Sequence, residues 1–579
     1  MGGFLLIIKK PTDSLEAVKE AHADVTATIA RRGIPLSEII DHRDCAAFIF
    51  AKANFRPESV LRFDNGDFIF ATGTLLYKNS LGAKALAALY DDFEPTGGRI
   101  FDSLRGHYFV CLAKDGGLYA FNDFNGIYGV YTNREKTIIS SSFLGLARSQ
   151  QPRTISEQEL FEYISHGAWY GDATMVKEVR RLDTHNLHRL KPHYAALAKA
   201  GSFPELDPGL KLEEQRDLVV RQLTGYFGSL KENLDNSICS ALSGGYDSRL
   251  MVGLCRQVGI NPLLYVYGAE DSPDVQISKL ICRGEHLPLT HQNKNGLPRV
   301  TVEEFVETVS AQYHFLDAQF EDGSFDPGTD LATRRWRTAQ ARLQLSGVGG
   351  EIYRNYFYVS ERPVEVYPLA RQHFEVPALD WFTSRFHREN YLQTLAAKLK
   401  FALGVTSDRL SRRQAEMAYP ALRLKYWMGS NVAANNVLSY ALAPFSEPVF
   451  TFPSLGIPTR YKYCGKFEAA VLSAVAPGLA KYPSIYGFNF YDPPPVSALL
   501  KNLLMVHTPV ALRPALLQPI RRWVAKKGEF PYYLQKDYVD AVLGSGERRV
   551  SQYIHLDRIT APKVMNRALT VELLLKDLF

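Results

Sequence analysis

The sequence predicts an α/β protein with two domains and a helical C-terminal extension. Short apolar segments separated by Gly, Asn and Asp turns fill residues 1 to about 195, which is typical of β-structure. From about residue 212 strand and helix patterns alternate, and beyond about residue 375 the pattern is mainly helical. Because 579 residues exceed one ordinary core, we expect domains at 1–195 and 212–579, joined by a linker at 199–209.

The first domain is expected to contain several short strands. The apolar start of the chain predicts the first strand, because its lysines follow the apolar run and no cleavage site is present. Four further strands are expected at 68–71, 108–113, 117–121 and 137–141. Asp115-Gly116-Gly117 is a strong hairpin signal between two of them.

Three strands of the second domain each run into a glycine-bearing turn. A strand at 238–242 leads into Ser243-Gly244-Gly245, one at 263–267 precedes a helix beginning near Pro273, and one at 342–345 ends in 346–351. Alternating strands and helices predict a parallel sheet, whose ligands bind at the carboxyl ends of its strands.

The segment from Ser243 to Ser248 carries the strongest chemical signal. Its two glycines, Gly244 and Gly245, let the backbone approach an anion, and the following helix start supplies free N–H groups. Ser243 and Ser248 add hydroxyl groups, and Asp247 places a carboxylate where a nucleotide-bound Mg²⁺ needs one. The Gly-Lys-Ser/Thr ending of a Walker A loop is missing. The segment resembles the pyrophosphate loop of enzymes that split ATP into AMP and pyrophosphate.

Composition excludes several classes of protein. A hydrophobic content of 46% and a charged content of 22% are those of a soluble globular protein, and no run of eighteen apolar residues predicts a membrane span. Six scattered cysteines without a C-x-x-C pair speak against zinc or disulfides and indicate a cytoplasmic location. A net charge of +6 is too mild to predict a nucleic-acid partner.

Ordered motifs in the second domain resemble the asparagine synthetase superfamily, which includes asparagine synthetase B, β-lactam synthetase and the lasso-peptide cyclases. The matching segments are Ser243–Ser248 (S-G-G-x-D-S), Val266–Asp274 (adenosine-flanking strand and loop), Ser346–Glu351 (G-E-G-S/A-D-E), Ala443–Pro448 (V-P-F-L-D) and Cys464–Glu468 (G-x-x-K-x-x-L). The resemblance implies a PP-loop ATP pyrophosphatase domain, of the adenine nucleotide α hydrolase-like fold, that uses ATP and Mg²⁺.

The resemblance also implies roles for individual residues. Asp247 and Glu351 would hold Mg²⁺, and Lys466 would stabilise charge on the reacting phosphate and carbonyl; these three are the candidate catalytic residues. The candidate residues for binding ATP or pyrophosphate are Leu242, Ser243, Gly244, Gly245, Asp247, Ser248, Val266, Tyr267, Gly268 and Gly347.

The N-terminal domain resembles a class II glutamine amidotransferase, an Ntn-hydrolase-like αββα sandwich with an N-terminal nucleophile. The segments that carry this likeness are Leu104–Val110, Asn122–Tyr131 and Ser140–Leu146. The family's nucleophilic cysteine is replaced by Gly2, and its Asn-Gly-Glu glutamine clamp by Gly73-Thr74-Leu75 or a close neighbour. We therefore expect a degenerate domain without glutaminase activity, because no thiol is placed to form a thioester.

One further departure concerns the amine. In the resemblance, Val348 stands where asparagine synthetases carry a glutamate that helps to deprotonate the amine. The sequence therefore does not identify the general base, and the candidates are Tyr353 or the substrate's own groups. Loss of the glutaminase favours an amine that belongs to the substrate.

The expected function is an AMP-forming, ATP-dependent carbon–nitrogen ligase that closes an amide within one molecule, as in lasso-peptide macrolactam or β-lactam formation. Its partners would be a small-molecule or peptide substrate with carboxylate and amine, together with a pathway protease or leader-binding protein in the peptide case. The main alternative is ammonia-dependent amidation of an amino acid or a polysaccharide sugar carboxylate. A PP-loop enzyme of nucleic acids, such as a tRNA thiolase or lysidine-forming ligase, and a catalytically dead scaffold are the hypotheses from other classes.

Overall fold

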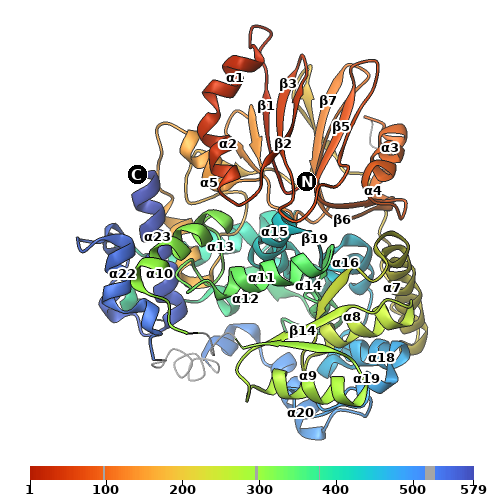
Figure 1. The fold of residues 1–579 in the computed structure, drawn as a ribbon. Helices are drawn as coiled ribbons and strands as arrows, with labels where there is room; N and C mark the ends of the chain where they lie inside the picture. The colour runs from red at the N-terminus through yellow and green to blue at the C-terminus, as the bar shows by residue number, and fades with distance from the viewer. Residues whose placement is uncertain (96–97, 294–297, 377, 516–528) are drawn as a thin grey trace.

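The computed structural model describes residues 1–95, 98–293, 298–376, 378–515 and 529–579. Figure 1 shows two antiparallel sheets stacked above a parallel sheet and its helices. Within the described ranges, no helix is long and apolar enough to cross a membrane.

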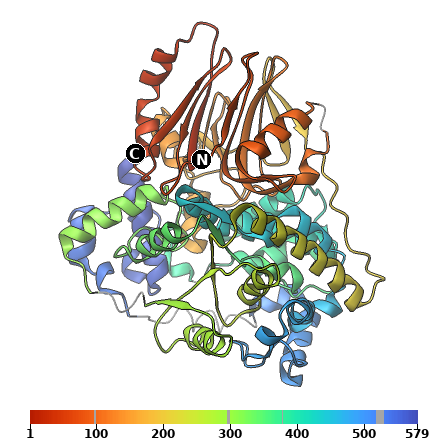
Figure 2. The same cartoon turned by 45° about the vertical axis from the view of Figure 1, so that its right-hand side comes forward.

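Two six-stranded antiparallel sheets form the N-terminal sandwich and lie face to face (Figure 2). The first sheet has the order β10 (Val179–Arg181), β8 (Tyr131–Asn133), β9 (Ile138–Ser140), β1 (Gly3–Ile8), β3 (Cys45–Phe50) and β2 (Leu36–Asp41). The second has the order β12 (Ala195–Ala198), β11 (Asn186–Lys191), β7 (Gly117–Asn122), β6 (Leu104–Lys114), β5 (Phe68–Tyr77) and β4 (Val60–Arg62). The expected strands are confirmed, and so is the hairpin, because Asp115 and Gly116 both adopt the positive φ that a tight β-hairpin turn requires.

Helices cover the outer faces of this sandwich. Helices α2 (Ala23–Ala30) and α5 (Phe143–Ser149) contact the first sheet, and α3 (Gly82–Asp92) contacts the second. The interior between the sheets is apolar; the rings of Phe4 and Phe109 stack there with centroids 4.1 Å apart. The arrangement is therefore a four-layer αββα sandwich.

A five-stranded sheet forms the centre of the second region, and all its neighbouring strands are parallel. Its order is β15 (Leu289–Gln292), β14 (Leu263–Tyr267), β13 (Ile238–Ala241), β16 (Leu343–Leu345) and β19 (Tyr440–Leu442). The predicted parallel sheet is confirmed, with the strand before the glycine loop at its middle.

Helices connect and cover the strands of this parallel sheet. Those that precede residue 375 are α7 (Leu212–Leu234), α8 (Tyr246–Gln257), α9 (Pro273–Gly284), α10 (Val302–Phe315), α11 (Thr329–Gln340) and α12 (Val366–Phe374). The later part of the chain is helical as expected, with α13 (Arg388–Ala402), α14 (Arg412–Ala418), the π-helix η4 (Tyr419–Met428), α15 (Gly429–Leu438), α16 (Pro448–Ser454), α18 (Lys466–Val475), α20 (Val496–His507), α22 (Lys536–Leu543) and α23 (Pro562–Leu578).

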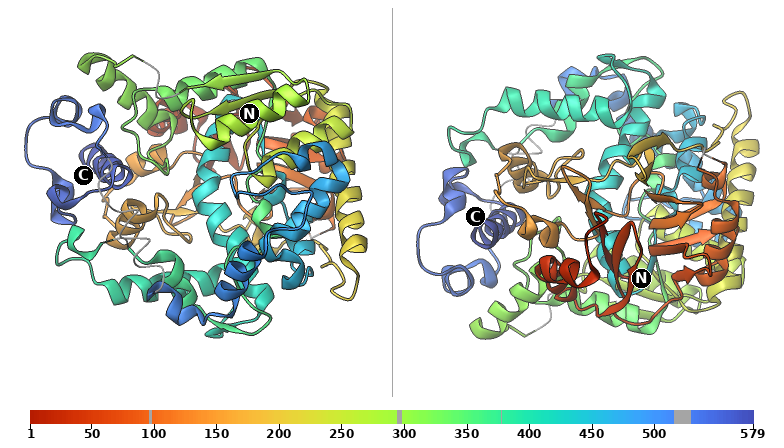
Figure 3. Two further views of the ribbon diagram at one scale, coloured as in Figure 1. Left: turned by 90° about the horizontal axis from the view of Figure 1, so that it is seen from below. Right: turned by 90° about the horizontal axis from the view of Figure 1, so that it is seen from above.

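The two regions share hydrogen bonds and apolar packing. Thr74 in β5 donates to the Asn436 side chain at 2.7 Å and accepts from the Ala441 amide at 2.9 Å, so a sandwich strand is fastened to β19. Helix α23 packs against α6 (Glu157–His166), and both lie at one end of the molecule (Figure 3). One apolar cluster draws side chains from both sides of the predicted linker.

Candidate functional site

The glycine loop follows strand β13 directly and opens helix α8. The Ser243 and Ser248 hydroxyl oxygens are 2.7 Å apart, and the Ser243 amide donates to the Ser248 hydroxyl at 3.0 Å. The Gly244 amide donates to the Asp274 carboxylate from α9 at 2.8 Å. The structure thus brings the predicted loop residues together at the carboxyl edge of the sheet, where one loop N–H already bonds an anionic oxygen.

The second glycine turn passes directly over the start of α8. A Cβ atom on Gly350 would lie 1.8 Å from Asp247 Oδ1, and one on Gly347 would lie 2.8 Å from the Asp247 backbone. Gly349 adopts a φ of 104°, which side chains disfavour. The three glycines therefore let the turn after β16 approach Asp247, and they explain why the sequence is glycine-rich there.

Arg354 lies at the centre of three carboxyl groups. Its Nη2 atom is 2.9 Å from both Asp247 oxygens and 3.2 Å from Glu351 Oε1, and its Nε atom is 3.0 Å from Glu468 Oε2. Tyr419 donates to the other Glu351 oxygen at 2.5 Å. Asp247 and Glu351 thus meet as predicted, but around a guanidinium group.

Glu468 is fully buried in this charge cluster and the other three members are partly buried, which changes the pKa of Glu468, Asp247 and Arg354. Burial and then the neighbouring Asp247 raise the pKa of Glu468, whose side chain is 0% exposed. Burial also raises the pKa of Asp247, and the Arg354 guanidinium opposes that rise. Burial works against the charge on Arg354, but the three carboxyl groups hold its pKa well above the usual range. One cation thus faces three acids, and burial favours the protonated forms of Asp247 and Glu468.

Asp247 and Glu351 do not fit a resident metal ion as arranged. Carboxylate oxygens are the donors that Mg²⁺ prefers. Arg354 contacts both Asp247 oxygens and one Glu351 oxygen, and Tyr419 takes the other. In the part of the chain that the structure describes, no three His, Cys, Asp or Glu side chains are placed to hold a metal. The guanidinium fills the position expected for the ion.

Lys466 begins helix α18 and its side chain is exposed. Its ammonium group lies 5.9 Å from the centre of the Tyr461 ring, and no described contact joins it to Asp247 or Glu351. A different lysine is buried nearby: Lys462 pairs with Glu416 at 2.9 Å. The structure therefore does not bring Lys466 into the charge cluster.

The residues predicted to flank the adenosine lie on the adjacent strand. Val266 and Tyr267 end β14, which pairs with β13, and Gly268 follows with a φ of 144°. Leu242 is buried behind the loop, and its carbonyl oxygen accepts from Ser278 at 3.0 Å. All of them therefore lie at or behind the edge that carries the glycine loop.

Sequence reasoning missed three side chains of the cluster: Arg354, Glu468 and Tyr419. Glu468 lies within the segment that predicted Lys466, two residues further along α18, and Arg354 follows Glu351 by three residues. The i,i+3 spacing was the only local signal for Arg354. Tyr353, a candidate base, is 1% exposed and packs against the Phe445 ring at 5.5 Å.

The positions at which the resemblance predicts a glutamine site are used for packing. A Cβ atom on Gly2 would lie 2.8 Å from the Ala51 carbonyl oxygen, so the backbone is closely packed where the family carries its nucleophile. Cys45 and Cys111 are buried between the sheets, and burial raises the pKa of both thiols. Thr74, in the clamp segment, makes the hydrogen bonds that join the two regions.

No family model and no curated protein matches this chain. A solved structure described as the allosteric regulatory enzyme of purine biosynthesis is similar at 10% identity and a TM-score of 0.24, over 52% of this chain and 67% of that one. Glutamine phosphoribosylpyrophosphate (PRPP) amidotransferase from B. subtilis, complexed with ADP and GMP, is similar at 8% identity and a TM-score of 0.24, over 50% of this chain and 65% of that one. At so low a TM-score the likeness shows neither the family nor the activity of this chain.

Proposed function

We propose that the protein is an ATP-dependent, AMP-forming amide-bond synthetase with a degenerate class II amidotransferase-like N-terminal domain. The observation that carries this proposal is the charge cluster of Asp247, Glu351, Glu468 and Arg354 beside the Ser-Gly-Gly loop at the carboxyl edge of a parallel sheet. Buried charges are costly, so a cluster of this kind at a ligand-binding edge favours a catalytic use.

The loop residues would bind the pyrophosphate part of ATP. The hydroxyl groups of Ser243 and Ser248 and the free N–H groups at the start of α8 supply donors, and the helix dipole favours an anion there. Binding would require the Gly244 amide to exchange the Asp274 carboxylate for a phosphate oxygen. The adenosine would lie along Val266, Tyr267 and Gly268 on the neighbouring strand.

In the first step a substrate carboxylate oxygen attacks the α-phosphorus, and the bond to pyrophosphate breaks. Arg354 is the described cation nearest to the loop carboxylate Asp247, and it would stabilise the charge that accumulates on the departing pyrophosphate. Mg²⁺ enters the proposal as the counter-ion of ATP. We assign it no step, because Arg354 occupies the predicted ligands.

In the second step an amine attacks the acyl-adenylate, AMP leaves, and the amine loses a proton. Val348 offers no base, and Tyr353 is buried in an apolar core, so the proton acceptor is assigned to the substrate. Lys466 would reach the reacting groups only by turning its exposed side chain inward. An amine within the same molecule fits a domain that supplies no ammonia from glutamine.

Exchange of labelled pyrophosphate into ATP tests the proposal directly, because only a reversible adenylation returns label to ATP. The assay uses the full chain with Mg²⁺, ATP and a panel of carboxylic acids, amino acids and peptides. Exchange that depends on one carboxylate supports adenylation. Absence of exchange across all three classes, in a folded preparation that binds ATP, removes the proposed function.

A further inference from the structure

A second cavity is lined by Tyr356, which also lines the cavity next to the charge cluster. Its interior offers about 60 Å³ to the centre of a water-sized molecule, and about 490 Å³ is empty when the opening to solvent is counted. Its walls include His166, Tyr170, Tyr356, Phe357, Phe374 and Arg423. This compact interior suits a small aromatic or apolar group and leaves no room for a folded or looped peptide.

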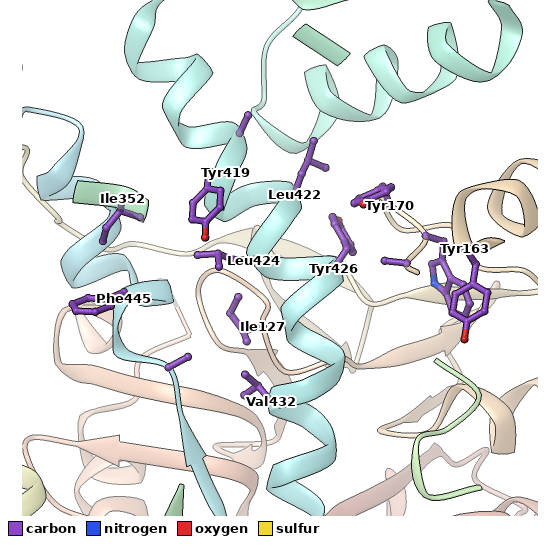
Figure 4. Close-up of a cluster of buried hydrophobic side chains, with 14 of the residues drawn as sticks. Ile127, Tyr163, Tyr170, Ile352, Tyr419, Leu422, Leu424, Tyr426, Val432 and Phe445 are labelled. Carbon is purple, nitrogen blue, oxygen red and sulfur yellow. The ribbon is translucent and has the colours of Figure 1, made fainter. Parts of the chain in front are cut away.

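Three elements from distant parts of the sequence build these walls. Tyr170 comes from the segment after α6, Phe374 ends α12, and Arg423 lies in the π-helix η4. The Tyr170 and Phe374 rings are 4.8 Å apart. Figure 4 shows Tyr170 opposite Leu422 and Tyr426 of that helix. π-Helical turns are uncommon and are often found at functional sites.

Arg423 gives this largely aromatic cavity a positive charge. Its guanidinium group stacks on the Trp427 ring at 3.6 Å and lies near the hydroxyl groups of Tyr356 and Tyr170. Among the ion pairs of the described residues, none involves Arg423. Stacking and a hydrogen bond to Tyr356 hold the guanidinium in place, and its remaining N–H groups can meet a ligand anion.

This cavity adjoins the candidate catalytic site. It shares Tyr356 and Phe357 with a smaller cavity whose walls include Glu351 and Arg354. The Tyr356 ring is 4.5 Å from the Tyr419 ring, and Tyr419 is hydrogen-bonded to Glu351. A molecule in the larger cavity is therefore separated from the charge cluster by one pair of aromatic side chains.

We infer that this cavity binds a small substrate with an aromatic or apolar body, whose anionic group is recognised by Arg423. Aromatic walls take up the body, and the planar guanidinium takes a carboxylate in a bidentate contact. The inference rests on the proposed function, because the ligand is a substrate only if its other end faces the proposed adenylation site. It favours a compact small-molecule substrate over a peptide.

Isothermal titration calorimetry without ATP tests the inference on the full-length protein. The probes are benzoate, phenylacetate and 3-phenylpropionate, with 3-phenylpropionamide as the neutral match. At least one acid should bind saturably, and the amide should bind about tenfold more weakly or not at all. Arg423→Gln should weaken the acid about tenfold or more, and Arg423→Lys should lose less, because it keeps the charge without the planar fork.

Arg409→Gln is the matched control, because Arg409 is an exposed arginine that lines other cavities. Unchanged acid binding in Arg423→Gln, equal binding of acid and amide, or no binding of any acid at 10 mM (a ceiling of about 3 kcal/mol of affinity) overturns the inference. Pyrophosphate exchange is measured separately. Acid binding that depends on Arg423 without exchange keeps the cavity and removes the synthetase, whereas exchange without such binding does the reverse.

Discussion

The interior of the N-terminal sandwich and the carboxyl edge of the parallel sheet differ both in burial and in chemistry. Between the sandwich sheets lie phenylalanine rings and the thiols of Cys45 and Cys111. At the parallel edge lie Asp247, Glu468 and Arg354, ionisable groups of which Glu468 is fully buried and the other two are partly buried.

This difference separates a supporting region from a candidate reacting region. An apolar interior stabilises the fold through burial, whereas buried charges cost free energy unless they are paired. A chain selected only for stability has little reason to gather three acids around one cation and to bury one of them fully. The proposed chemistry therefore belongs to the parallel edge, and the proposed role of the sandwich is structural.

The largest effect is expected from Asp247→Ala at the parallel edge. Exchange of pyrophosphate into ATP should fall about 100-fold or more, because the loop loses the carboxylate that faces Arg354. Circular dichroism and the melting temperature show whether the variant is folded. A folded variant with unchanged exchange would contradict the assignment of the charge cluster.

Arg354→Met should destabilise the protein strongly. It leaves the buried Glu468 and Asp247 without their cation, and removing one partner of a buried pair costs about 3–5 kcal/mol. Urea unfolding measures the loss. Adding Glu468→Gln to Arg354→Met should recover part of the lost stability. A double variant no more stable than Arg354→Met alone would show that the charges of Arg354 and Glu468 are not coupled.

Glu447 joins the two regions and predicts a pH dependence of stability. Tyr226 donates to one of its oxygens at 2.5 Å and the Gly106 amide to the other at 2.9 Å, and burial raises its pKa to about 7. Since the pKa is higher in the folded state, the stabilisation is present below pH 4.5 and is lost as the pH rises through 7. In the unaltered protein this group should lower the free energy of unfolding by on the order of 1–3 kcal/mol between pH 5 and 8, and Glu447→Gln should abolish that decrease. Melting temperatures recorded from pH 5 to 8 measure the effect. Parallel pH profiles of both proteins would contradict this.

The smallest effect is expected inside the sandwich. Cys111→Ala should cost about 1 kcal/mol of stability and leave exchange unchanged, because the thiol is buried and burial raises its pKa. The unaltered protein should release no ammonia from glutamine. Loss of exchange in a folded Cys111→Ala variant, or glutamine hydrolysis that depends on Cys111, would show that the sandwich takes part in the chemistry.

Much of the fold followed from local patterns. Apolar runs ending in glycine turns located β13, β14 and β16, and the Asp115-Gly116 pair located a hairpin. These features depend on residues close in sequence. The meeting of Asp247 with Glu351 also followed, because the ends of parallel strands share one edge.

The remaining parts of the site depend on contacts between distant segments. Tyr419 reaches Glu351 from 68 residues away, and Arg423 shares a cavity with Tyr170 from the sandwich side of the linker. No spacing rule anticipates such contacts. The exposed position of Lys466 was hidden for the same reason, since the entry angle of α18 decides which side chain faces the cluster.

The packing of α23 against α6 has a consequence for how the chain is made. The Arg567 guanidinium donates to the Ser165 carbonyl oxygen across 402 residues of sequence. At a synthesis rate of roughly 5–20 residues per second, α6 waits on the order of 20–80 s on the ribosome for its partner. During that time the part of α6 that packs against α23 is open to chaperones and to neighbouring nascent chains. Slow codons in the segment between the two helices, or too little chaperone while it is translated, would therefore lower the yield of soluble protein. This loss of yield would be larger than the stability of the finished molecule suggests.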